Sequence, residues 1–118
     1  MERVILDTNS LIYAIKNKID IEYELKGIIP PVLPAIPECV IVELQGLGTS
    51  RWYARAALEY SKRFEYVHSS GEGDFCVMMT AIHMNASVLT NDRQFLKKLK
   101  SRGVRCMTLT GSHRIQFY

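Results

Sequence analysis

Short apolar runs alternate along this chain with segments in which apolar residues recur at helical spacing. The run 3–6 is followed by Leu11, Ile12 and Ile15, which fall on one face of a helix. Strands that alternate with helices form βαβ units, so we predict an α/β protein with a mostly parallel sheet and helices on both faces. The expected strands are 3–6, 32–36 (weakened by Pro34), 64–67, 87–90 and 104–109; the expected helices begin after Asp7, cover 19–26 and 38–47, run from a capping Ser50 to Tyr60, and cover 71–84 and 93–101.

Length and composition limit the class of protein. A chain of 118 residues with 47% hydrophobic and 23% charged residues is typical of one globular domain, which we expect to span 1–118. The longest uncharged apolar run, 27–37, contains all four prolines and is too short to cross a bilayer. No targeting segment is recognisable, so we expect a soluble protein with no membrane contact.

The cysteines and histidines show no metal-ligand spacing. Three widely separated cysteines without a C-x-x-C pair argue against both a disulfide framework and a standard zinc site. They are typical of a reducing compartment, and we expect a cytoplasmic protein. All six residues are therefore interpreted as ordinary core or surface positions: Cys39, Cys76, Cys106, His68, His83 and His113.

Positive charge is concentrated near the C-terminus. Residues 92–118 carry seven Lys or Arg against one Asp, a net charge of +6, whereas residues 1–91 carry eight against eleven acids, a net charge of −3. Such a segment is either a solvated helix face or a surface that binds nucleic acid.

Four acidic residues lie where solubility does not require them. Asp7 directly ends an apolar strand, and Asp92 follows the strand 87–90 after one intervening residue. Each of these two could simply cap the helix that follows it. The carboxyl ends of parallel strands meet at one edge of a sheet, so the two carboxylates converge if their strands are neighbours.

The other two acids lie on predicted helices. Glu43 shares the spacing of Leu44 and Leu47, so we expect it on a core-facing stripe, where an unpaired charge costs several kcal/mol. Asp74 precedes Val77 by three residues and is expected to point toward the sheet, although it could also be a first-turn acid favoured by the helix dipole.

Four converging carboxylates require a counter-charge. Two of them about 4 Å apart repel by roughly 4 kcal/mol at an effective dielectric of 20. The four motifs contain no Lys, Arg or His before Arg93, and oxygen-only ligands select Mg²⁺ or Mn²⁺. Such an ion activates water for attack on a phosphodiester, and the basic segment that begins at Arg93 would meet a polyanionic substrate.

The chain resembles the PIN-domain nucleases over roughly residues 3–109. The similarity rests on four motifs in the family's order: V-I-L-D-T-N at 4–9, P-E-C-V-I-V-E-L at 37–44, G-E-G-D at 71–74, and L-T-N-D-R-Q-F-L at 89–96 followed by Gly103-Val104. The resemblance implies a three-layer α/β/α sandwich and Mg²⁺- or Mn²⁺-dependent endonucleolytic cleavage of single-stranded RNA.

The resemblance also assigns residues to this activity. Catalysis and metal binding fall to the acids Asp7, Glu43, Asp74 and Asp92; Asn9 and Thr90 match polar positions that support them; and we expect Arg93, Lys97, Arg51 and Arg55 to hold RNA phosphates. One position departs from the pattern. Many members carry a second acid where this chain has Phe75, which would weaken one metal subsite.

The family includes the toxins of toxin–antitoxin pairs and nucleases of ribosomal RNA processing. The segments 90–93 and 103–105 favour the second group slightly. The resemblance implies a homodimer and either an antitoxin or a ribosome-assembly partner, with Trp52-Tyr53 or the tail 110–118 as candidate interfaces.

Two other hypotheses remain open at this point. The first is a phosphatase with Asp7 as its nucleophile, but Asn9 replaces the usual second Asp and no Lys lies in 71–76. The second is a non-catalytic RNA-binding or scaffold module, which Phe75 favours and the four acids disfavour.

Overall fold

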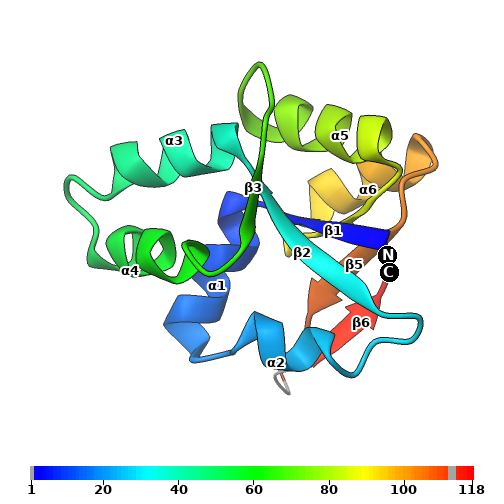
Figure 1. The fold of residues 1–118 in the computed structure, drawn as a ribbon, viewed down its shortest axis with the longest axis horizontal. Helices are drawn as coiled ribbons and strands as arrows, with labels where there is room; N and C mark the ends of the chain where they lie inside the picture. Colours follow the sequence, from blue (N-terminus) through cyan, green and yellow to red (C-terminus); the bar gives the residue numbers. More distant parts are fainter. Residues whose placement is uncertain (1, 112–113) are drawn as a thin grey trace.

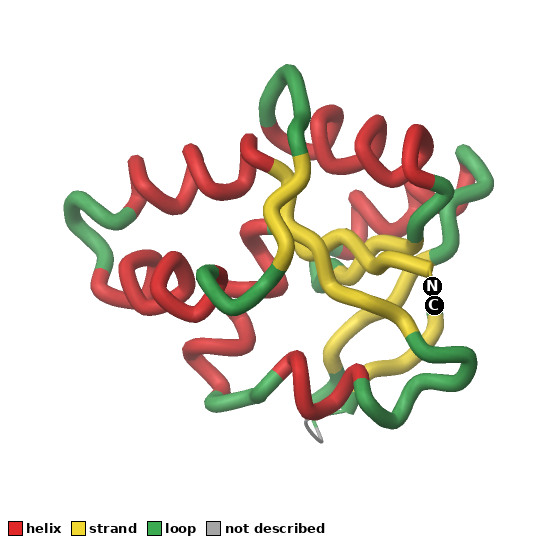
Figure 2. The backbone as a smooth tube through the Cα atoms, in the orientation of Figure 1, coloured by secondary structure: helices red, strands yellow, loops and turns green. Residues whose placement is uncertain are grey.

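The computed structural model describes residues 2–111 and 114–118. Within these ranges the strands form one sheet in the order β3-β2-β1-β4-β5-β6, and helices cover it on both faces (Figure 1, Figure 2). The strands are β1 Glu2–Leu6, β2 Val32–Pro37, β3 Glu65–Val67, β4 Ser87–Leu89, β5 Cys106–Leu109 and β6 Ile115–Phe117. The helices are α1 Thr8–Asn17, α2 Ile21–Leu25, α3 Glu38–Leu47, α4 Trp52–Ser61, α5 Gly73–Met84 and α6 Arg93–Ser101. The predicted three-layer α/β/α architecture is confirmed.

The two central strands hold the core. β1 pairs in parallel with both β2 and β4, with Leu6 opposite Leu89. Ile5, Leu6, Val88 and Leu89 are fully buried, as expected for strands covered on both faces. Because β1 and β4 are neighbours in register, the residues that follow them lie at the same edge of the sheet.

Pro34 is tolerated in β2 although this strand lies between β1 and β3. β3 pairs only with 35–37, so on that side Pro34 interrupts no ladder hydrogen bond.

Several element boundaries differ from the prediction by one or two residues, and one strand was not predicted. The N-cap of α4, for example, is Arg51 rather than Ser50. The tail contributes β6, which pairs antiparallel with β5, and the Tyr118 amide donates to the Cys106 carbonyl at 2.9 Å. The short mixed sequence of this tail carries no strand signal of its own, and its pairing depends on the exposed edge of β5.

The expectation that the cysteines form no disulfide is wrong. Cys39 in α3 and Cys76 in α5 are joined, with their Cα atoms 6.7 Å apart, because these two helices pack side by side. Cys106 is free and buried. His68 and His83, expected at ordinary core or surface positions, are exposed, and the prediction for His113 lies outside the described residues.

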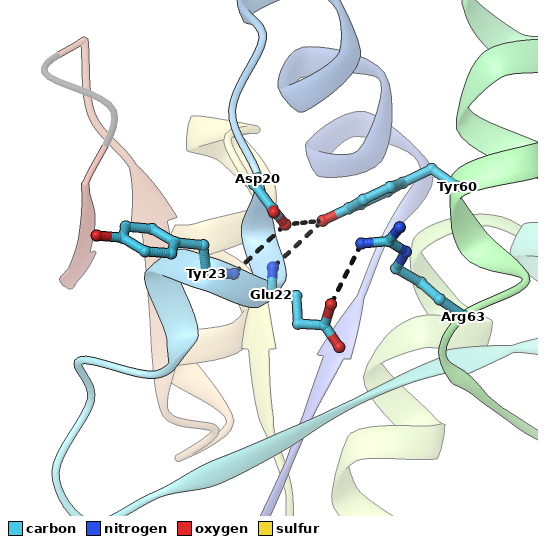
Figure 3. A network of polar contacts seen from close by, with 5 residues as sticks. All are labelled: Asp20, Glu22, Tyr23, Tyr60 and Arg63. Carbon is cyan, nitrogen blue, oxygen red and sulfur yellow. Dashed lines mark hydrogen bonds and ion pairs between the residues drawn. The ribbon is translucent and has the colours of Figure 1, made fainter.

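A polar network joins α2 to α4 (Figure 3). Asp20 caps α2 and accepts a hydrogen bond from the Tyr60 hydroxyl at 2.8 Å, while Arg63 pairs with Glu22 at 3.2 Å. Burial raises the pKa of Tyr60 to about 12, so its hydroxyl stays protonated and can donate.

None of the helices in the described part of the chain has the length and apolar character needed to cross a membrane.

Candidate active site

A cavity of about 270 Å³ lies where the chain leaves β1 and β4. The structure brings all four predicted acids into its wall, two from the residues that follow these strands and two from α3 and α5. The lining residues are Asp7, Thr8, Asn9, Ile12, Cys39, Val40, Glu43, Gly73, Asp74, Val77 and Asp92.

Asp7 is the buried member of the four, with only 5% of its surface exposed. It caps α1, and its Oδ1 accepts a hydrogen bond from the Ser10 amide at 2.8 Å. Burial raises the pKa of Asp7 to about 6. Hydrogen bonds from the Thr90 side chain and from Ser10 lower it, and the charge of Asp74 adds to the rise.

Asp92 caps α6 in the same manner. Its Oδ1 accepts from the amides of Gln94 and Phe95, and its own amide donates to the Thr90 hydroxyl at 3.2 Å. Both Asp7 and Asp92 therefore do serve as helix caps. Because the capping bonds use Oδ1, capping does not exclude a second interaction of either carboxylate with the cavity.

Asn91 fixes the turn that carries Asp92. Its Oδ1 accepts hydrogen bonds from the Thr108 hydroxyl and the Leu109 amide, and its Nδ2 donates to the Leu109 carbonyl at 3.2 Å. These three bonds tie the turn to β5. In the sequence, the signal for this role of Asn91 is its place between Thr90 and Asp92.

Glu43 does not lie on a buried stripe, contrary to the prediction. Its neighbours Val40 and Leu44 are buried, whereas Glu43 itself is exposed. The cavity interrupts the core at this point, so the helix face that carries Glu43 meets solvent. The Thr8 hydroxyl donates to Glu43 Oε1 at 2.6 Å and thereby links α1 to α3.

Asp74 is likewise exposed, in the first turn of α5, and it lines the cavity at the carboxyl edge of the sheet. Gly71 and Gly73 precede it with φ of +80° and +64°, a backbone conformation that favours glycine. Partial burial raises the pKa of Asp74, and the charges of Asp92 and Glu43 add to this, whereas Lys98 lowers it. The four acids are thus electrostatically coupled.

The charge of the basic side chain Lys98 reaches Asp74 in the cavity wall, an effect that was not predicted from the sequence. Lys98 lies six residues beyond Asp92, outside every motif. The predicted phosphate-binding residues Arg93, Lys97, Arg51 and Arg55 are exposed but do not line the cavity. The Arg55 guanidinium instead donates to the Gly48 carbonyl at 2.9 Å, beyond the end of α3.

The two predicted supporting residues occupy different positions. Thr90 is fully buried beneath Asp7, and Asn9 is exposed in the cavity wall. Phe75, next to Asp74, is 63% exposed.

The donor set suits a hard divalent cation. Among the residues described by the structure, no three His, Cys, Asp or Glu side chains are already close enough to hold a metal ion. The cavity nevertheless offers carboxylate, hydroxyl and amide oxygens, while Cys39 is held in a disulfide and presents no thiolate. A cation that keeps several waters, as Mg²⁺ does, can engage such carboxylates directly or through those waters and relieve their mutual repulsion.

Comparison with known proteins identifies the family. Residues 4–112 match the model of the PIN like domain. The chain is 31% identical to Ribonuclease VapC9 of Archaeoglobus fulgidus, over 85% of this chain and 77% of that protein. It is 28% identical to the rRNA-processing protein fcf1 of Schizosaccharomyces pombe over 96% of this chain, but spans only 61% of that relative.

A solved structure supports the same assignment. The structure of the PIN domain endonuclease Utp24 superimposes with a TM-score of 0.83 at 28% identity, covering 98% of this chain and 90% of the other. The order of the sheet, the acidic cavity and these similarities agree: this chain belongs to the family of PIN-like domains.

Proposed function

We propose that this PIN-like chain is a divalent-metal-dependent endoribonuclease that hydrolyses phosphodiester bonds of single-stranded RNA. The observation that carries the proposal is the gathering of Asp7, Glu43, Asp74 and Asp92 in the wall of one cavity. The names of the relatives, a ribonuclease, an rRNA-processing protein and an endonuclease, support the reaction class.

Asp7 and Asp74 would hold Mg²⁺ or Mn²⁺, and Asp92 and Glu43 would complete the shell directly or through water. A cation bound there would supply an activated water and neutralise charge that develops on the phosphoryl oxygens. The protein prepares the ligands: the α1 cap and Thr90 orient Asp7, and the α6 cap orients Asp92.

The remaining polar residues would position the RNA. Asn9 faces the cavity and can orient a carboxylate or a ligand water. Lys98 offsets the negative charge at Asp74. Arg93 and Lys97 project from the same helix into solvent, where they would contact phosphates that flank the cleaved bond. Arg51 and Arg55, from the start of α4, would contact more distant phosphates.

We place this activity in ribosomal RNA processing, with a ribosome-assembly partner. The similarity to fcf1 and to Utp24 extends over 96% and 98% of the chain, against 85% for VapC9. A toxin paired with an antitoxin is the alternative, favoured by the identity of 31% to VapC9. The homodimer remains a prediction.

Cleavage of a panel of end-labelled single-stranded transcripts tests the function. We expect the wild type to cut in Mn²⁺ or Mg²⁺ and to be inactive in EDTA, and Asp7→Asn to lose cleavage at least 100-fold while Asp20→Asn, the matched change in a helix cap outside the cavity, retains it. Calorimetry should show weaker Mn²⁺ binding to the Asp7 variant. Equal cleavage by wild type and Asp7→Asn would refute the assignment, and RNA binding without cleavage would favour a non-catalytic module.

A further inference from the structure

A second groove opens beside the acidic cavity, between α3 and the loop that leads into α5. Its volume is about 620 Å³, in the range of small-molecule sites. It shares the lining residues Cys39, Glu43 and Gly73 with the cavity, so the two spaces adjoin. The lining residues are Glu38, Cys39, Val42, Glu43, Ser69, Ser70, Gly71, Glu72 and Gly73.

The charge around this groove excludes a phosphate. Glu43 and Glu72 carry no described cationic partner. Glu38 Oε1 lies 2.6 Å from Nδ1 of the His68 ring and accepts a hydrogen bond from the Ser69 amide at 3.1 Å. The apolar part of the wall is Val42, which is 65% exposed. An occupant should therefore be uncharged, in part apolar, and able to donate hydrogen bonds to carboxylates. A nucleobase has these properties.

Phe75 lies beside the same groove. It is in the first turn of α5, directly after Asp74, and is 63% exposed. A Cβ atom built on Gly71, which lines the groove, would be 3.8 Å from Cδ1 of the Phe75 ring. The ring thus rests against the groove's loop with much of its surface open to a planar ligand.

We propose that this groove, together with the Phe75 ring, is a nucleobase subsite. The proposal rests on the proposed function: every phosphodiester carries a nucleoside on each side, so when one occupies the acidic cavity, one adjoining nucleoside lies over the neighbouring groove. Phe75 stacks on that base, and the carboxylate of Glu72, which lines the groove but not the acidic cavity, accepts from its N–H groups. Phe75, which takes the place of an acid in the family pattern, determines how the flanking nucleotide is held.

A protein–RNA double-mutant cycle tests this inference. The probes are a single-stranded oligonucleotide that the wild type cuts at one bond and two copies with an abasic residue immediately 5′ or 3′ of that bond. Phe75→Ala should weaken binding of the intact RNA roughly 5- to 150-fold, the range for loss of one base–aromatic stack. One abasic substitution should weaken wild-type binding to a similar extent, and combining it with Phe75→Ala should cost little more.

Two controls make the result specific. Phe75→Tyr keeps a stacking ring and should bind like the wild type. Tyr23→Ala removes an aromatic side chain of similar exposure, 69%, from α2 and should change the affinity neither for the intact RNA nor for the abasic RNAs. Independent, multiplicative losses from Phe75→Ala and from both abasic positions would overturn the subsite.

Failure of the subsite and failure of the proposed function can be told apart. Affinities are measured by fluorescence anisotropy in the Asp7→Asn background, so the cycle does not depend on catalysis. If the wild type cuts no RNA, the probe is an oligonucleotide that the wild type binds, and an abasic residue is placed at each of its positions in turn. Coupling between Phe75 and one base without cleavage would support the groove and refute the nuclease. Cleavage without any coupling would support the nuclease and refute the groove.

Discussion

Replacing Asp7 with Asn should stabilise the metal-free protein. Asp7 is buried and caps α1 through Oδ1, an interaction that the amide oxygen of Asn preserves because Asn is an equally good capping residue. The buried charge is what changes. The Thr90 hydroxyl beneath the side chain can rotate to accept from the new amide group.

The magnitude follows from the pKa of Asp7, which burial raises from 3.8 to about 6. The folded protein therefore binds this proton more tightly than the unfolded chain. The stabilisation that proton binding at Asp7 provides is fully present below pH 3.8 and is lost as the pH rises through about 6. The difference corresponds to roughly 3 kcal/mol at neutral pH. Without metal, we expect Asp7→Asn to be more stable by about that amount at pH 7.5 and by less than roughly 1 kcal/mol at pH 4.

Urea denaturation in EDTA at several pH values measures this difference. Asp20→Asn is the matched control, since Asp20 also caps a helix but the hydrogen bond from Tyr60 lowers its pKa. The stabilisation that Asp20 provides is present above its unfolded pKa and is lost as the pH falls, so its Asn variant should be destabilised at pH 7.5. The reasoning would be refuted if Asp7→Asn showed no gain in the free energy of unfolding at neutral pH, or if the gain were equally large at pH 4.

Two further predictions concern the supports of the site. The disulfide closes a loop with a sequence separation of 37 residues, so its reduction should lower the free energy of unfolding by about 4 kcal/mol. Alkylation of the unfolded, unreduced chain should label Cys106 alone. Labelling of all three cysteines would disprove the bridge. Asn91→Ala removes three hydrogen bonds to β5 and should lower the free energy of unfolding, measured by urea denaturation, by roughly 2–4 kcal/mol. The control Asn17→Ala removes one exposed hydrogen bond and should lower it by under about 1 kcal/mol. Equal losses would show that Asn91 does not hold the turn against β5.

The position of Asp7 and Asp92 could be predicted from the sequence because Asp7 follows a buried strand directly and Asp92 follows another after a short turn. Once β1 and β4 are neighbours, chain direction alone brings both acids to one edge of the sheet. The bounds of the five predicted strands lie within two residues of the observed bounds, because short apolar runs bounded by capping residues leave few positions where a strand can end.

The features that were mispredicted depend on contacts between distant elements. The helical spacing around Glu43 indicated a core stripe, but periodicity does not show where a cavity interrupts the core. The pairing of Cys39 with Cys76 depends on how α3 and α5 pack, and that of β6 on the open edge of β5. Lys98 affects Asp74 from another helix, which no local motif reveals.

The disulfide also has a consequence for the unfolded chain. Glu43 is four residues from Cys39, and Asp74 is two from Cys76, so in the oxidised denatured state a tether of about 20 Å of backbone plus the crosslink still joins the two carboxylates. In the reduced chain the 30 residues between them can extend to about 100 Å. The oxidised unfolded chain would therefore retain a pair of carboxylates that binds a divalent cation weakly. Because this binding to the unfolded chain opposes stabilisation, the cation would raise the melting temperature less in the crosslinked protein than in the reduced one.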